Sequence, residues 1–298
     1  MNRVADTSIV VLIGAVCLLA IVATTVGLFW PFPVIDVRTL TSFRGEEITL
    51  FGTGLYRHET SLLGAGFVGQ DWVTLCLATP LLIIAAVRTK VPGPSSDVLL
   101  LAVLSYFLYA YATFAVGAQF NVLFLVYVGL FSASLFGVIL VGRRLVAELN
   151  ELTAVQWARL PRRAPSMLLL GAGVATAAIW LVPLMPPLVS GGYPSTLGHR
   201  TTSVTDALDL AVIVPSAILA AWLVWRGAAT GYAMAAALLG IITMLLPTIL
   251  AGTVVQMWAG VVFTLPEIVG PIGGFLAIGT LGAWALASIA QALPRPSR

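Results

Sequence analysis

Eight long apolar stretches dominate this sequence and restrict what the chain can fold into. As a helix, each is roughly long enough to cross about 30 Å of hydrocarbon, given some tilt and anchoring at the interface. We therefore predict an all-α membrane protein, a bundle of about eight transmembrane helices. The stretches lie near residues 8–30, 71–87, 98–116, 122–141, 167–184, 207–225, 232–250 and 272–293.

The composition supports a membrane protein and argues against other classes. Hydrophobic residues make up 59% of the chain and charged residues 9%, whereas a soluble domain carries about 25% charged residues. The net charge is only +3 and the basic residues are spread through short loops, so nucleic-acid binding has little support. Cys17 and Cys76 fall in apolar stretches, which indicates neither a disulfide framework nor a metal-thiolate site. We predict no cofactor.

The first apolar stretch could be a signal peptide or a retained helix. The apolar region of a signal peptide has about 7–15 residues. The stretch from Ser8 to Trp30 is longer, which favours a helix that remains in the protein.

The distribution of basic residues predicts the orientation. Most of the 15 lysine and arginine residues fall on one side of the predicted topology, and Arg38, Arg44, Arg57 and Arg200 fall on the other. The richer side is expected to be cytoplasmic. We therefore predict a multi-pass protein of the plasma (inner) membrane with both termini in the cytoplasm. Most of the acidic residues lie on the outer side.

Three segments outside the stretches have distinct patterns. In the outer loop 31–70, the runs EEITL and LYRHET flank FGTG, which predicts a small extracytoplasmic hairpin. The outer loop 185–205 is rich in Pro, Gly, Ser and Thr. In the inner segment 142–165, apolar residues recur at helical spacing beside arginines, which predicts an amphipathic helix on the inner leaflet. These apolar residues are Leu145, Leu149, Leu152 and Val155.

The chain has signs of an internal duplication. DWVTLCLATPLLIIAA, from Asp71, resembles DALDLAVIVPSAILAA, from Asp206, because each starts with Asp and has Pro nine residues later, at Pro80 and Pro215. A parallel repeat of two four-helix halves would place these stretches as the second and sixth spans. We divide the chain into a first half (1–142), a cytoplasmic amphipathic linker (143–165) and a second half (166–298). Convergence on an acid and a proline is the alternative.

Acidic residues near the outer ends of the spans have two interpretations. Asp71, Asp206 and Asp209 fall at predicted helix starts, where a carboxylate caps free backbone N–H groups. Asp209 lies nearly one turn further in, where ionised groups are costly and commonly functional. Glu267 lies in a stretch broken by Pro and Gly, which suits a re-entrant helix lining a cavity or an interfacial loop.

Other polar residues on the outer side are weaker candidates. His58 and His199 are the two histidines, and they lack the fixed spacing of a metal motif, so we predict no metal site. Arg57 and Arg200, each next to a histidine, could contact lipid phosphate or an anionic ligand, or simply be surface arginines.

The third span carries polar groups that could form a cavity wall or satisfy one another. Tyr106, Tyr109 and Thr113 share a face, and Gln119 and Asn121 follow at the outer end. Tyrosines inside a bundle usually hydrogen bond to a neighbour.

One resemblance extends over most of the chain. The stretch YFLYAYATFAVGAQFNVLFLVYVGLF, preceded by GFVGQDWVTLCLATP and followed by VTDALDLAVIVP, resembles an uncharacterised group of bacterial eight-span membrane proteins. The resemblance implies the topology and carries no function.

These observations favour an outward-opening cavity between the two halves that binds or transports a small solute, ion or lipid headgroup. One alternative is a membrane-embedded enzyme acting on a lipid-linked substrate at the outer leaflet, and another is a structural subunit of a complex. Membrane lipids are the expected partners, and the sequence does not identify any protein partner. The candidate ligand-binding residues are Asp71, Asp206, Asp209, Glu267, Tyr109, Gln119, Asn121, His58, His199, Arg57 and Arg200.

Overall fold

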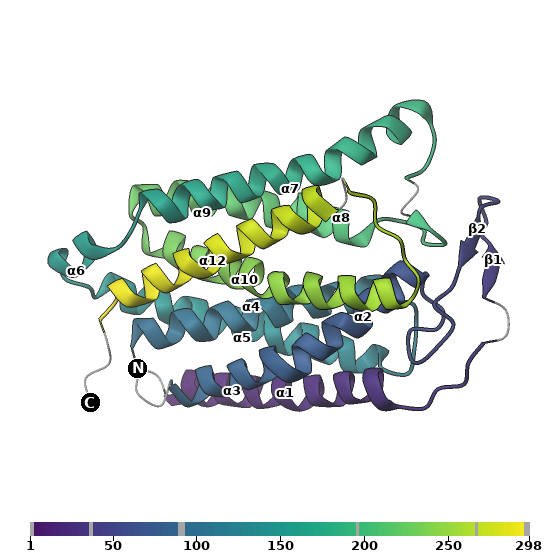
Figure 1. The fold of residues 1–298 in the computed structure, drawn as a ribbon. Coiled ribbons are helices and arrows are strands. Elements are labelled where there is room, and N and C mark those ends of the chain that lie inside the picture. The colour runs from purple at the N-terminus through teal and green to yellow at the C-terminus, as the bar shows by residue number, and fades with distance from the viewer. Residues whose placement is uncertain (1–2, 36–37, 89–92, 195–196, 266–267, 295–298) are drawn as a thin grey trace.

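The fold is a bundle of long apolar helices (Figure 1). The computed structural model describes residues 3–35, 38–88, 93–194, 197–265 and 268–294. Within these ranges, eight helical segments are long and apolar enough to cross a membrane, as predicted. They are Thr7–Phe29, Ser61–Arg88, Pro94–Gly117, Phe124–Asn150, Arg163–Ser190, Val204–Arg226, Ala229–Trp258 and Gly273–Ala292.

The elements follow one another in a simple order. The first half contains α1 (Arg3–Phe29), β1 (Thr39–Thr41), β2 (Glu47–Thr49), α2 (Ser61–Val73), η1 (Thr74–Ala78), α3 (Thr79–Arg88), α4 (Pro94–Gly117) and α5 (Phe124–Asn150). The rest contains α6 (Ala154–Arg159), α7 (Arg163–Ser190), α8 (Val204–Leu208), η3 (Asp209–Ile213), α9 (Val214–Arg226), α10 (Ala229–Trp258), η4 (Ile268–Ile272) and α12 (Gly273–Ala292). The segments η1, η3 and η4 are single turns of π-helix.

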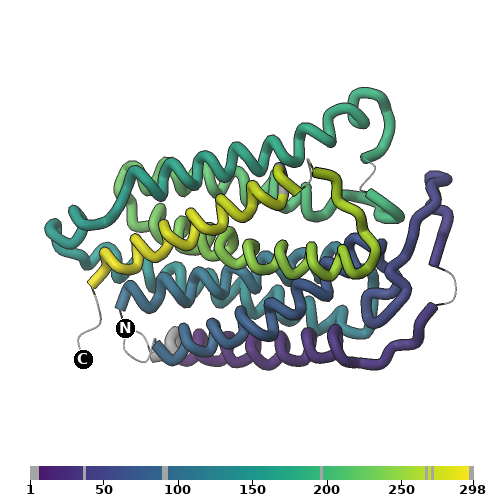
Figure 2. The backbone as a smooth tube through the Cα atoms, viewed as in Figure 1, coloured from purple at the N-terminus to yellow at the C-terminus, as the bar shows by residue number. Residues whose placement is uncertain are grey.

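Helix α4 is the centre of the bundle. It packs against α3, α5, α10 and α12, and most of its residues are buried, including Tyr106, Phe107 and Tyr111. Helix α10 approaches α4 closely, because a Cβ atom on Gly240 would lie 2.4 Å from the backbone of Ala102. Figure 2 traces the chain from α1 on one flank to α7 on the opposite flank, with α4 and α10 between them.

The two ends of the bundle differ. The β1–β2 hairpin projects from one end, which we call the hairpin end (Figure 1). Helix α1 begins and α12 ends at the opposite end, which also carries α6.

The segment between α1 and α2 contains a two-stranded antiparallel hairpin, but with different strands from those predicted. Strand β2 coincides with the predicted run EEITL, and its partner is Thr39–Thr41, which comes before it. The predicted second run, LYRHET, instead turns back so that Leu50 pairs with Thr60 in an isolated bridge.

Two predicted boundaries are wrong. The second span begins at Ser61 and not at Asp71, because Thr60 caps the helix by accepting a hydrogen bond from the Leu63 N–H. Loop 31–70 is therefore shorter than predicted. In the linker, Leu145 and Leu149 belong to the end of α5 and are fully buried. The short helix α6 is a separate element, and its Trp157 packs against Tyr232 of α10 with ring centroids 5.7 Å apart.

Helices two and six contain the same local distortion. In η1 the Thr79 N–H bonds to the Thr74 carbonyl, and in η3 the Val214 N–H bonds to the Asp209 carbonyl, both five residues back. Pro80 and Pro215 follow directly, and each lacks the N–H of a regular helical bond. A wider turn next to the proline accommodates this loss.

The contact between α4 and α10 gives the first prediction. Replacing Gly240 by Ala places a methyl group against the Ala102 backbone, so we expect a loss of about 1–3 kcal/mol and a lower melting temperature in detergent. The control is Gly171→Ala in α7, where a Cβ atom would meet nothing within 4 Å. Alanine is the better helix former, so the control should melt at the same or a higher temperature. Equal melting temperatures for the two variants would contradict the close packing.

Candidate functional site

A partly open cavity of about 450 Å³ lies at the hairpin end of the bundle. The chain just before α2 forms one wall, and the turn between α4 and α5 forms another. The cavity combines polar and apolar groups. Its lining residues are Phe32, Leu55, Tyr56, Arg57, His58, Glu59, Gln119, Phe120, Asn121, Val122, Phe124 and Leu125.

The turn between α4 and α5 is shaped by its own polar side chains. The Asn121 carboxamide oxygen accepts a hydrogen bond from the Leu123 N–H at 2.9 Å, and its amide nitrogen donates to the Gln119 carbonyl at 3.2 Å. Such a local side-chain bond is typical of Asn in turns. It holds the wall between Gln119 and Leu123 in one conformation.

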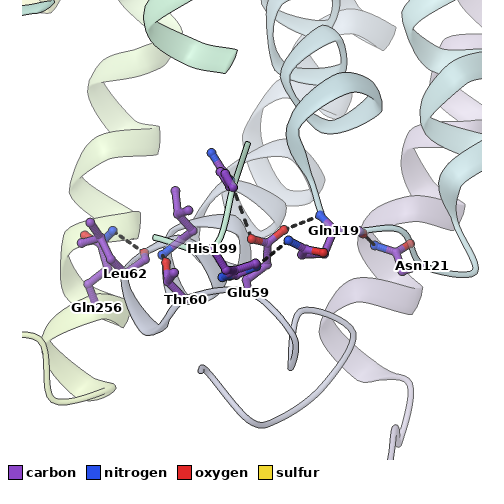
Figure 3. A network of polar contacts seen from close by, with 9 residues as sticks. Glu59, Thr60, Leu62, Gln119, Asn121, His199 and Gln256 are labelled. Atoms are coloured by element: carbon purple, nitrogen blue, oxygen red, sulfur yellow. Dashed lines mark hydrogen bonds and ion pairs between the residues drawn. The ribbon is translucent and has the colours of Figure 1, made fainter. Parts of the chain in front are cut away.

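Glu59, which directly precedes α2, connects this turn with the loop after α7 (Figure 3). Its side chain is buried, with 1% exposed, and one carboxylate oxygen accepts the Gln119 N–H at 2.6 Å. The other oxygen lies 3.7 Å from an Arg200 guanidinium nitrogen. Burial raises the pKa of Glu59, while the Gln119 N–H and the Arg200 charge act to lower it.

The loop after α7 contributes His199 and Arg200 to this network. The His199 ring contacts the Gln119 side chain, and Arg44 of the hairpin segment holds the loop through the carbonyls of Gly198 and Arg200. Burial lowers the pKa of His199, and the charges of Arg200 and Arg44 lower it further. The hairpin, this loop and the cavity wall therefore form one polar assembly.

Arg57 and His58 lie on the cavity wall itself. The Arg57 guanidinium stacks over the Phe32 ring at 5.2 Å and donates to the Gly54 carbonyl at 3.3 Å. Most of its donors are left for other partners. His58 is exposed. Of the predicted site residues, Arg57, His58, Gln119 and Asn121 line the cavity, while His199 and Arg200 support it.

Asp71 is not a helix cap. It lies well inside the helical segment that begins at Ser61, with 2% of its side chain exposed. Its carboxylate accepts the Tyr56 hydroxyl at 2.6 Å. A Cβ atom on Gly27 of α1 would lie 2.1 Å from that carboxylate, so the glycine is required for Asp71 to fit.

Asp209 and Asp206 belong to the second half. Asp209 accepts hydrogen bonds from the Tyr109 hydroxyl at 2.9 Å and from the Trp180 indole N–H at 2.8 Å. Asp206 lies in the first turn of α8. None of Asp71, Asp206 and Asp209 lines the cavity, so the acids are not gathered around it as predicted. Glu267 lies outside the described residues.

The sequence interpretation missed Tyr56, Glu59 and Trp180. Tyr56 and Glu59 fall in LYRHET, which looked like a strand. The Thr60-Ser61 start of an apolar helix was a signal that these residues directly precede α2. Nothing in the sequence around Trp180 indicates that it meets Asp209.

Within the described part of the chain, no three His, Cys, Asp or Glu residues are grouped as metal ligands. No protein family, curated protein or solved structure matches this chain. The function is therefore argued from the residues of the cavity and their surroundings.

The lowered pKa of His199 gives the second prediction. Below about pH 6.5 the unfolded chain takes up a proton that the folded protein resists, so stability falls as the pH drops. The raised pKa of Glu59 gives the opposite slope at lower pH. We expect the melting temperature to fall between about pH 7.5 and about pH 5.5, and His199→Gln to reduce that fall.

The matched control is His58→Gln, which replaces the exposed histidine. This variant should keep the pH dependence of the unmodified protein. An unchanged pH dependence in His199→Gln would show that the half-buried ring does not resist protonation.

Proposed function

We propose that this protein is a multi-pass membrane protein that binds a lipid headgroup in the cavity at its hairpin end. The observation that carries the proposal is the exposed apolar rim of that cavity. Phe120 is 81% exposed, Val122 73% and Leu125 77%, although all three line a cavity that also holds polar groups. An exposed apolar patch next to polar groups suits an amphiphile, whose chain would cover the rim.

The charges of the cavity favour an anionic headgroup. Arg57 offers a planar guanidinium, which suits a phosphate oxygen pair. Glu59 is the carboxylate on this wall, and it already interacts with the Gln119 N–H and Arg200. The amides of Gln119 and Asn121 could complete the contacts to a headgroup.

The distribution of basic residues supports an outward-facing hairpin end. A cluster of arginines lies at the end of the bundle opposite the hairpin, in the last turns of α5, in and after α6, and at the start of α7. These residues are Arg143, Arg144, Arg159, Arg162 and Arg163. Basic residues are retained on the cytoplasmic side of a membrane. We infer that the protein spans the plasma membrane with its cavity on the side facing away from the cytoplasm.

We also infer that the two halves arose by duplication. The sequence offset between Asp71 and Asp206 also separates η1 from η3 and Pro80 from Pro215. The contacts of α1 with α3, and of α4 with α5, recur as contacts of α7 with α9, and of α10 with α12. A parallel repeat with an axis along the membrane normal explains both observations.

The third prediction tests lipid binding. Phosphatidylglycerol should raise the melting temperature of the detergent-purified protein more than phosphatidylcholine does, because a bound ligand stabilises the folded state. Arg57→Gln removes a charged hydrogen-bond donor, which should weaken binding about ten- to hundredfold.

The control variant is Arg38→Gln, which changes an exposed arginine of the same segment that does not line the cavity. It should keep the full shift. A full shift with glycerol phosphate alone would indicate a soluble anion, and an equal shift in Arg57→Gln would contradict the proposed site.

The fourth prediction tests the orientation. In a variant with Cys17 and Cys76 replaced by alanine, cysteines at Glu47 in the hairpin and at Tyr193 should react with an impermeant thiol reagent in intact cells. A cysteine at Asn150 should react only after the cells are opened. All three positions are exposed in the structure. Labelling of position 150 in intact cells would reverse the orientation.

A further inference from the structure

Asp71 is a buried carboxyl group without a structural role as a cap. Ten residues of helix, at about 1.5 Å each, separate it from Ser61 and place it about 15 Å below the helix start. At that depth its side chain cannot reach the free N–H groups of the first turn. Ionisable groups at such positions in membrane helices are costly and commonly functional.

The titratable groups that face Asp71 are all tyrosines. Tyr56 comes from the segment before α2, Tyr106 and Tyr111 from α4, and Tyr127 from α5. Each is at most 2% exposed. Helix α1 contributes Gly27, which has no side chain.

Among the described residues, no arginine or histidine forms an ion pair with Asp71. A carboxylate buried among neutral phenol groups therefore has no cation to balance its charge. Such a charge is costly in a low-dielectric interior unless a ligand neutralises it.

Polar groups connect Asp71 to the cavity. Tyr56 lines the cavity and donates its hydroxyl hydrogen to Asp71. The Tyr127 hydroxyl lies beside that of Tyr56 and near Asn121, which also lines the cavity. In the described structure this hydroxyl is buried without a hydrogen bond of normal geometry, so it is available to pass a proton.

We propose that Asp71 is a proton-binding site that exchanges with the cavity through Tyr56. A hydronium ion in the cavity gives a proton to the Tyr56 oxygen, directly or through Tyr127, while the Tyr56 hydroxyl gives its own proton to the Asp71 carboxylate. One O–H bond breaks and one forms at Tyr56, which ends unchanged. The hydronium ion becomes water, and Asp71 becomes neutral.

A proton fits this site better than a metal cation does. The Tyr56 hydroxyl directs its hydrogen at the carboxylate over 2.6 Å, so the space between them cannot hold a cation. Oxygen-binding cations such as Ca²⁺ also take about six or more ligands. Within the described residues, Tyr56 is the side chain that the structure shows hydrogen bonded to Asp71. This inference is independent of which ligand occupies the cavity.

The fifth prediction tests the site by infrared difference spectroscopy of the membrane-reconstituted protein between acidic and alkaline buffer. The acidic form should show a carboxylic C=O band that shifts in heavy water, as a protonated aspartate does. Asp71→Asn should remove this band. If the Asn variant does not fold, Asp71→Glu provides the same test, because it keeps the carboxyl group and should shift the band.

The path is tested by the rate at which the band appears after a pH jump. Tyr56→Phe should slow its appearance about tenfold or more, because it removes the hydroxyl that passes the proton. The matched control is Tyr106→Phe, an equally buried tyrosine whose hydroxyl bonds Thr74 at 2.7 Å, and its rate should be unchanged. The proposal is overturned if the Asn variant keeps the band, if Tyr56→Phe keeps the rate, or if sodium at constant pH abolishes the band.

Discussion

The enclosure of α4 determines how the rest of this bundle is arranged. A helix that is apolar on every side can face lipid or be buried among other helices, and α4 is buried because α5, α10 and α3 cover it. Gly240 allows the α10 backbone to approach the α4 backbone at Ala102, and most residues of α4 are buried. The few polar groups of α4 must then find partners on the helices around it. Tyr106 meets Thr74, and Tyr109 meets Asp209, which fixes the positions of the second and sixth spans against the centre.

The π-helical turns provide these partners. Both Thr74 and Asp209 are the first residue of a π turn, and each turn ends before a proline that cannot complete a regular helical bond. A π turn inserts extra backbone, which rotates the residues on its two sides relative to each other. The same distortion therefore accommodates the hydrogen bond that the proline cannot make. It also presents a polar side chain to α4 on each side of the bundle.

Much of this architecture could be predicted from the sequence, because long apolar stretches leave little choice but a spanning helix. The boundaries could not be predicted where packing outweighs local composition. The residues before Asp71 were assigned to loop 31–70, yet Gly69 lies within α2, where a Cβ atom would meet the Gly252 backbone at 2.4 Å. The cavity was anticipated only in part. Gln119 and Asn121 were candidates, but Glu59 comes from a distant segment and joins them only through the packing of the helices.

Asp71 and Asp209 are both buried carboxyl groups in π-containing spans, and the number of their donors distinguishes them. Asp209 accepts a phenol O–H and an indole N–H from α4 and α7, so its two oxygens each have a fixed partner and it joins three spans. Within the described residues, Asp71 accepts one side-chain hydroxyl, from Tyr56, which also lines the cavity. A fully bonded carboxylate gains little from a proton, because protonation would displace one of its donors. Tyr56 is the side-chain donor that the described structure shows for Asp71, so a proton can bind without displacing a second such donor. Aspartate therefore holds spans together in one half and, as we propose, exchanges a proton in the other.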